Sequence, residues 1–212
     1  MDRRAVNATL ENEPKMKQVL AICAITLSGF SLAAQASDGT ETPKNEIEVR
    51  GFAKGDSTVK AYFEKAITDT VSLNLTAFKT RGWDAATVGP TFHISPAMSL
   101  GIGLGTSRYM ANDERSKSSH ATASLFWFWK TDAWEAEVLV ERYSRDPKPW
   151  YQEGYAQKRI GNGFAAGVFA KKDTGWGPRL SYRITENINV WVAPLVKKSG
   201  NTTAILGGVV SF

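Results

Sequence analysis

From residue 46 onward, hydrophobic and polar residues alternate in short runs that are separated by turn-forming residues. The runs VSLNLTA (71–77), MSLGIGLG (98–105) and RLSYRI (179–184) are examples. A repeat of two residues is that of a β-strand, because successive side chains of a strand point to opposite faces. Residues 46–212 contain no segment with a helical period, so the sequence predicts an all-β protein.

Five short turns in this region share one build, in which three turn-forming residues stand between two residues that would pair. In an antiparallel hairpin, directly paired residues share a face, and a three-residue loop pairs residue i with residue i+4. Four of the five predicted pairs join two hydrophobic residues. The pairs are Ile67 with Val71, Ile94 with Met98, Lys130 with Trp134, Ile160 with Phe164 and Ile184 with Ile188.

Longer, polar connections alternate with these turns, and together they delimit twelve strands. A three-residue loop at 55–57 would place Val49 opposite Phe63 and Ala53 opposite Val59. Short turns at one end and long loops at the other are typical of an outer-membrane barrel, whose tilted strands need about 9–11 residues. We therefore predict an antiparallel transmembrane β-barrel of 12 strands over 46–212, with both termini periplasmic. The predicted strands are 46–54, 58–67, 71–79, 85–94, 98–109, 120–130, 134–144, 150–160, 164–172, 177–184, 188–196 and 202–212.

A soluble sandwich or a lipocalin-like barrel would also alternate, with its hydrophobic residues turned inward. Two features favour a polar interior and a lipid-facing exterior. Charged residues recur at alternate positions within strands, and aromatic residues gather near strand ends, as in interfacial girdles. The girdle candidates are Trp83, Tyr109, Trp129, Trp134, Trp150, Phe164 and Phe212, and the outward face of strand 150–160 includes Gln152 and Lys158.

The N-terminus has the build of a secretory signal. Met16 and Lys17 precede an apolar run over 19–27, and Ala34-Gln35-Ala36 fits a cleavage site. We predict that 1–36, an upstream extension plus signal peptide, is removed after Ala36, and that 37–45 is a flexible periplasmic leader. A retained membrane helix is the alternative, but a span needs about 20 apolar residues.

Composition excludes several classes of function. The chain has one Cys and two His, which leaves little material for a metal site, and we expect neither a metal nor a cofactor. The net charge of +5 is small and both signs are spread along the chain, so we expect no nucleic-acid partner.

Charged residues predicted to face the lumen are the candidates for a functional site. They are Arg50, Lys54, Lys60, Glu64, Glu135, Glu137, Glu141, Arg179 and Arg183. The first and seventh strands lie roughly opposite in a twelve-stranded barrel, so an acidic wall would face a partly basic wall and orient charged or dipolar solutes. Alternatively, these charges pair and fill the lumen. Small inward residues such as Gly101 and Gly103 would leave space, or would serve close packing.

The pairing of residue i with residue i+4 has an unfavourable consequence for the segment FWFWK (126–130). If Lys130 pairs Trp134, then Phe126 and Phe128 face lipid while Trp127 and Trp129 face the lumen. Lys130 would then point outward at the membrane interface and would have to snorkel.

An enzyme is the less favoured alternative. His93 and Ser95 share a strand face, and some outer-membrane lipid hydrolases use a His-x-Ser pair. A nucleophile and its base need a hydrogen bond and a third group that orients the base. Because His93 is predicted to face the lumen and Ser95 to open a turn, we expect no catalytic residues.

The chain ends in Phe212 after an alternating strand, which resembles bacterial outer-membrane β-barrel proteins, whose C-terminal strand is an assembly signal. The motif Ile47-Glu48-Val49-Arg50-Gly51, the strand count and the charged inward tracks resemble the small monomeric oligogalacturonate-specific porins. The resemblance implies a passive channel for small hydrophilic, possibly anionic, solutes in the bacterial outer membrane. The alternative function is that of a surface barrel with a filled lumen. Its basic loops would contact anionic lipid or a partner, or would simply be solvated.

Overall fold

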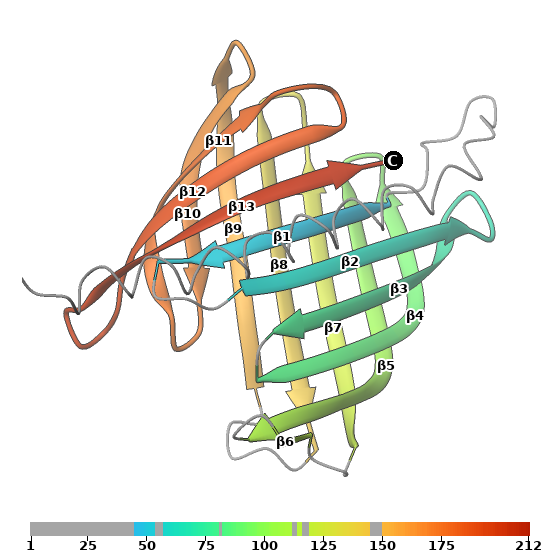
Figure 1. Cartoon of the computed structure of the whole chain (residues 1–212). Helices are drawn as coiled ribbons and strands as arrows, with labels where there is room; N and C mark the ends of the chain where they lie inside the picture. Colours follow the sequence, from blue (N-terminus) through green and yellow to red (C-terminus); the bar gives the residue numbers. More distant parts are fainter. Residues whose placement is uncertain (1–44, 54–56, 81, 112–113, 116–118, 145–149) are drawn as a thin grey trace, which may run out of the picture. The chain divides into compact units, whose positions relative to one another are not determined.

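The protein folds into a closed antiparallel barrel made by twelve of the thirteen strands that the structure describes, which confirms the predicted fold class (Figure 1). The computed structural model describes residues 45–53, 57–80, 82–111, 114–115, 119–144 and 150–212. The predicted signal peptide and most of the leader lie outside these residues and stay predictions. The strands are β1 (Glu46–Phe52), β2 (Ser57–Ala66), β3 (Val71–Thr80), β4 (Trp83–Ser95), β5 (Met98–Ala111), β6 (Glu114–Arg115), β7 (His120–Lys130), β8 (Trp134–Tyr143), β9 (Trp150–Gly161), β10 (Phe164–Lys171), β11 (Gly175–Arg183), β12 (Ile188–Val196) and β13 (Thr202–Ser211).

Closure of the sheet joins the first strand to the last. β1 pairs with β13 from Glu46 opposite Ser211 to Phe52 opposite Ile205, and β4 pairs with β5. Closure leaves no strand edge, which lipid would not tolerate because it offers no hydrogen bonds to unpaired backbone groups. β6 pairs with the end of β5. No helix in the described part of the chain is long and apolar enough to cross a membrane.

Four of the five repeated turns keep the predicted strand register. At two of them the amide of Ile67 donates to the carbonyl of Val71, and that of Ile184 to Ile188, each at 2.9 Å. The turns after Ile94 and Ile160 are tighter, and a register shift beside each absorbs the extra residue. At the second of these, Asn162 and Gly163 have positive φ angles of 48° and 82°, a conformation that Asn and Gly adopt most readily.

The fifth turn differs from the prediction, and the difference reverses the faces of FWFWK. Lys130 pairs with Glu135 rather than with Trp134, so the loop holds four residues. Thr131 stabilises it, since its amide donates to the Trp134 carbonyl (2.8 Å) and its hydroxyl accepts from the Trp134 amide (3.0 Å). A shift of one residue turns every side chain to the other face. Phe128 and Lys130 therefore face the lumen, Trp129 faces outward, and the expected snorkelling of Lys130 was wrong.

The first hairpin is also wider than predicted, without a change of faces. Val49 pairs with Val59 rather than with Phe63, and Gly51 pairs with Ser57. The register differs by an even number of residues, so each side chain keeps its predicted face. Lys54, one of the candidate lumen residues, lies outside the described residues.

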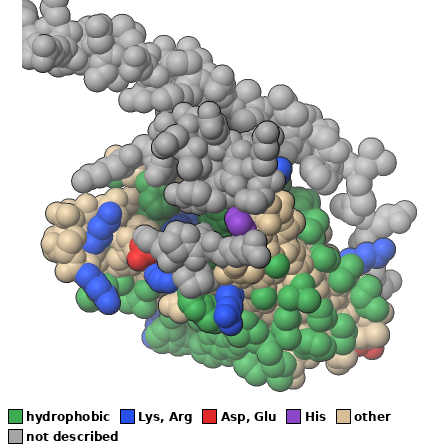
Figure 2. Space-filling view, turned by 90° about the horizontal axis from the view of Figure 1, so that it is seen from below, with side chains coloured by type: hydrophobic (Ala, Val, Ile, Leu, Met, Phe, Trp, Pro, Cys, Tyr) green, Lys and Arg blue, Asp and Glu red, His purple; other side chains and the backbone are tan. Residues whose placement is uncertain are grey.

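The outer wall of the barrel is a belt of exposed hydrophobic side chains. Figure 2 shows one side of the molecule, where such side chains cover a large part of the described surface. Gln152 and Lys158 also point outward, as predicted, and both lie near the ends of β9. A water-soluble barrel would bury its hydrophobic residues, so this belt faces lipid. Its exposed members include Leu73, Leu75, Val88, Ile102, Leu104, Leu125, Val138, Val168, Leu180, Val192 and Leu206.

The interior is packed toward the end that carries the long loops. Phe169, Trp191, Ala193, Leu195 and Ile205 form one buried cluster. A second cluster joins Phe78 and Trp83 to Tyr143 and Tyr151, with ring centroids 4.6 to 5.9 Å apart. Trp83 was predicted to lie in the lipid girdle, but the register of β4 turns it inward.

One of the lumenal glycines serves close packing rather than open space. A Cβ at Gly103 would lie 2.4 Å from the Ser124 hydroxyl and 2.9 Å from Thr87. These two hydroxyls are hydrogen bonded to each other at 3.1 Å. The absence of a side chain at residue 103 therefore lets β4 and β7 share a hydrogen bond across β5.

The corrected register of β7 predicts a difference in thiol reactivity. In a Cys-free background, Phe128→Cys should react with a water-soluble maleimide in lipid vesicles, because residue 128 lines an aqueous cavity. Trp129→Cys should react at least about tenfold more slowly, because residue 129 faces lipid, which excludes a charged, water-soluble maleimide. If Trp129→Cys reacted faster than Phe128→Cys, the loop after Lys130 would hold three residues, as predicted from the sequence.

Candidate functional site in the barrel lumen

Eight of the nine charged candidates are described, and their side chains lie on the lumenal face. Seven of these side chains are buried or half-buried. Arg183 is exposed, and it lies at the end of the barrel that carries the short turns, which we call the short-turn end. The strands bring charges of both signs to the same height. Their functional role is a prediction from the sequence.

Arg50 and Glu153 form the most buried ion pair. Nη1 of Arg50 donates to Oε2 of Glu153 at 2.5 Å, and Nη2 donates to Oε2 of Glu48 at 2.5 Å. The Arg50 side chain is 3% exposed and that of Glu153 is 5% exposed. A guanidinium that bonds two carboxylates satisfies the condition under which buried charges are tolerated.

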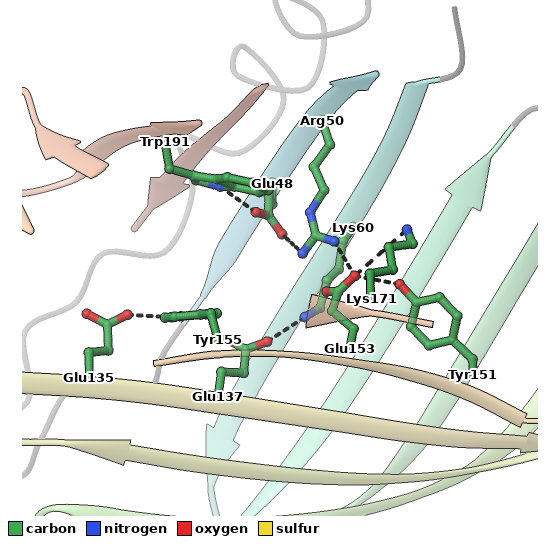
Figure 3. Close-up of polar contacts among 10 residues, drawn as sticks. All are labelled: Glu48, Arg50, Lys60, Glu135, Glu137, Tyr151, Glu153, Tyr155, Lys171 and Trp191. Atoms are coloured by element: carbon green, nitrogen blue, oxygen red, sulfur yellow. Dashed lines mark hydrogen bonds and ion pairs between the residues drawn. The ribbon is translucent and has the colours of Figure 1, made fainter. Parts of the chain in front are cut away.

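A second ion pair links other strands at the same level (Figure 3). Nζ of Lys60 on β2 lies 2.7 Å from Oε1 of Glu137 on β8. Lys171 of β10 lies 3.8 Å from Glu153, and the Tyr151 hydroxyl donates to the same carboxylate at 2.6 Å. Glu153 is thus the acceptor on which three strands converge.

Two of these ion pairs, Arg50–Glu153 and Lys60–Glu137, cross the lumen rather than run along its wall. Four strands separate β1 from β9 on the shorter path around the sheet, and four separate β2 from β8. The predicted opposition of an acidic and a partly basic wall therefore takes the form of direct contacts. We call the set Arg50, Glu48, Lys60, Glu137 and Glu153 the cross-lumen layer.

Aromatic rings stack with the arginines beside this layer. The Arg50 Cζ lies 5.5 Å from the centroid of the Trp191 ring, and the Arg179 Cζ lies 4.3 Å from it. The ring of Tyr155 is 3.9 Å from Arg179. Trp191 also donates from Nε1 to Glu48 at 2.8 Å. Cation–π contacts of this kind are stronger in desolvated surroundings.

The sequence did not identify several members of this arrangement. Glu153, Tyr155, Lys171 and Trp191 all lie at inward positions of β9, β10 and β12. The alternation of these strands could have revealed their direction, but their inward faces mix aromatic, charged and small residues. Glu141, which was predicted, accepts a hydrogen bond from Tyr143 and is buried.

Another candidate acid, Glu64, belongs to a separate polar cluster around His93. Oε1 of Glu64 lies 3.0 Å from Nε2 of His93, and Nε2 also lies 2.8 Å from the Ser72 hydroxyl. Nδ1 of His93 lies 3.1 Å from the Ser99 hydroxyl. Ser95 instead accepts from the amide of Ala97 at 3.3 Å. Among the described residues no hydrogen bond joins His93 to Ser95.

A cavity of about 290 Å³ extends from the cross-lumen layer toward the short-turn end. We call it the vestibule. Six basic and five acidic side chains line it, among them Arg50 and Lys60 of the layer and Arg183 and Glu186 nearer the turns. The residues that the structure describes include no group of three or more His, Cys, Asp or Glu side chains that could hold a metal ion.

Comparison with known proteins identifies the fold. No protein-family model and no curated protein matches the chain. Among solved structures, outer membrane phospholipase A from Escherichia coli matches with a TM-score of 0.50 and 10% identity, over 84% of this chain and 94% of that one. The chain has the fold of an outer-membrane β-barrel. With the exposed hydrophobic belt, this fold indicates the bacterial outer membrane, the location predicted from the sequence.

Two further matches extend the same likeness. A protein from a study of the in-meso crystallization of membrane proteins has a TM-score of 0.54 at 7% identity, over 80% of this chain and 83% of that one. The KdgM porin is 14% identical over 80% of this chain and 99% of its own, with a TM-score of 0.47. Identities this low show a likeness of fold alone.

The burial of the Arg50–Glu153 pair predicts a large cost for removing one partner. Glu153→Gln should lower the free energy of unfolding by about 3–5 kcal/mol, because the Arg50 charge would lose a partner inside the barrel. The measurement is urea unfolding in lipid vesicles. Arg108→Met is the matched control, since Arg108 pairs with Asp84 at 3.3 Å on an exposed site. That change should cost about 0–1 kcal/mol. Equal effects would contradict the prediction.

Proposed function

We propose that the protein is a narrow channel for small hydrophilic solutes, with the cross-lumen layer as its constriction. The observation that carries the proposal is the vestibule, a charged cavity that leads directly to the Lys60–Glu137 pair. Lys and Glu side chains are flexible, so a solute or a change of voltage could displace them. Rings of charge select solutes by sign and size in other channels.

The sign of the selectivity is part of this proposal. The vestibule has one more basic than acidic side chain, which supports at most a weak preference for anions. The paired residues of the layer contribute little net field. A channel with this lining would discriminate mainly by size and by the orientation of a solute's own charges.

The packed aromatic residues favour a second candidate, a surface barrel with a filled lumen. Phe78 of β3 contacts Tyr151 of β9, and four strands separate β3 from β9 on the shorter path around the sheet. Trp83 of β4 contacts Tyr143 of β8, and these rings lie beyond the cross-lumen layer. Rings in edge contact are harder to displace than a single flexible ion pair. The basic loops would then be the working surface, in contact with anionic lipid or a partner.

In either case we expect a monomer that is surrounded by outer-membrane lipid. Phe212, the expected assembly signal, has its amide bonded to the Asn45 carbonyl at 3.0 Å, and its ring lies 6.2 Å from that of Phe63. The periplasmic position of this end is part of the proposal, together with a cleaved signal peptide that ends at Ala36.

Planar-bilayer conductance distinguishes the two candidates. The wild type should give small conductance steps, and the double variant Lys60→Ser/Glu137→Ser should raise them by roughly two- to fivefold, because it shortens both side chains at the constriction. Arg108→Ser/Asp84→Ser is the control, because it removes an ion pair from the outer wall and should change nothing. If neither wild type nor lumenal variant conducts, the filled-lumen candidate replaces the channel.

We also propose that the protein is not a lipid hydrolase. His93 faces the lumen, and its serine partner Ser72 is buried. A purified sample should hydrolyse no phospholipid beyond the rate in vesicles without protein, and His93→Ala and Ser95→Ala should leave that rate unchanged. Hydrolysis by the wild type that either change abolishes would overturn this proposal.

A further inference from the structure

Four inward positions on neighbouring strands form one row in the wall of the vestibule. Glu135 of β8 pairs with Gln157 of β9, Gln157 pairs with Gly167 of β10, and Gly167 pairs with Arg179 of β11. Neighbouring strands lie about 4.8 Å apart. Gly167 has no side chain, so the row presents an acid, an amide, a gap and a base in that order.

Arg179 is the base at one end of this row, and it is buried. It is 3% exposed, and the rings of Tyr155 and Trp191 contact its guanidinium. Within the described part of the chain it forms no ion pair, and its Nε has no hydrogen-bond partner. Stacking satisfies the faces of a guanidinium, but its N–H groups lie in the plane and need acceptors. Arg179 lines the vestibule, so a ligand there could supply them.

Glu135 is the complementary group at the other end of the row. Its Oε1 accepts from the Tyr155 hydroxyl at 2.5 Å. Lys130 is its cross-strand neighbour, yet no ion pair joins the two among the residues that the structure describes. Glu135 therefore presents a carboxyl group at the vestibule wall, and its hydrogen-bond donor among the described residues is the neutral Tyr155 hydroxyl.

Tyr155 fixes the distance between these two charges. Its ring stacks on Arg179 and its hydroxyl bonds to Glu135, so the base and the acid are separated by little more than a phenol (Figure 3 shows Tyr155 and Glu135). Between them, Gln157 accepts from the Ser181 hydroxyl at 3.1 Å through Oε1, which leaves its amide N–H groups as donors. Both polar ends of a ligand would thus meet preset partners.

We propose that this row is a binding site for a small zwitterion, such as an amino acid or a short peptide. Its carboxylate would accept from the Arg179 N–H groups and the Gln157 amide, and its ammonium group would donate to Glu135. Charge-assisted hydrogen bonds of this kind are roughly twice as strong as neutral ones. A polyanion would meet Glu135 and the other vestibule acids, so the row favours a ligand with both charges.

The site goes beyond the proposed channel and does not depend on conduction. Binding to the vestibule requires access from the short-turn end alone. A barrel whose lumen is closed at the cross-lumen layer would still bind the ligand, so a negative conductance experiment leaves the binding experiment intact.

The test uses isothermal titration calorimetry on the folded barrel with glycylglycine as the probe. N-acetylglycine keeps only the carboxylate and glycinamide keeps only the ammonium group. The wild type should bind glycylglycine about tenfold or more tightly than either analogue, because each analogue forgoes one charged hydrogen bond. Glu135→Gln should reduce glycylglycine to the affinity of N-acetylglycine, and Arg179→Gln should reduce it to that of glycinamide.

Two matched controls share the cavity but not the row. Arg183→Gln and Glu186→Gln remove an exposed base and an exposed acid from the vestibule, and each should alter the affinity by no more than about twofold. Heat-modifiable migration on gels checks that each variant is folded. If Arg179→Gln does not fold, the affinity of Glu135→Gln for glycylglycine tests the proposal by itself. The proposal is overturned if glycylglycine does not bind, if N-acetylglycine binds equally well, or if the controls weaken binding as much as the row variants.

Discussion

The ion pair between Arg50 and Glu153 joins opposite walls of the barrel, and the arrangement of the interior depends on it. A charge of this burial is costly unless it is paired and hydrogen bonded. Glu153 gathers Arg50, Tyr151 and Lys171 from three strands, and Arg50 brings in Glu48, which accepts from Trp191. The pair thus fixes the positions of Tyr151 and Trp191, which flank it, and of the cation Lys171.

Lipid makes such an interior possible. In water, the hydrophobic residues of these strands would have to be buried, and the charged residues would face solvent. Here the closed sheet satisfies its backbone internally and turns one hydrophobic face to lipid, so the lumen receives the opposite face of each strand, which carries the buried charges. Charged side chains from opposite walls meet inside the lumen with little exposure to solvent, and they pair directly with each other.

The period of two was sufficient to predict the barrel, the strand count and the direction of most side chains. It failed at Lys130, because a loop of four residues instead of three is invisible in the alternation of FWFWK, where every neighbour is aromatic. Arg50 and Lys60 keep their predicted faces although the predicted register of the first hairpin was wrong, because the two registers differ by an even number of residues. The partners of these residues could not be predicted, because the heights of Glu137 and Glu153 across the lumen depend on the tilt of the strands.

The pairing also separates the charges that can act on a solute from those that cannot. A solute that bound Arg50 or Glu153 would have to displace an existing partner and leave another charge exposed to a desolvated wall. Arg179 and Glu135 are different, because rings and a phenol hydroxyl occupy them without neutralising them. A ligand at these two groups would replace no ionic contact. We therefore infer that the paired layer holds the opposite walls together, whereas recognition falls to Arg179 and Glu135, which form no ion pair among the described residues.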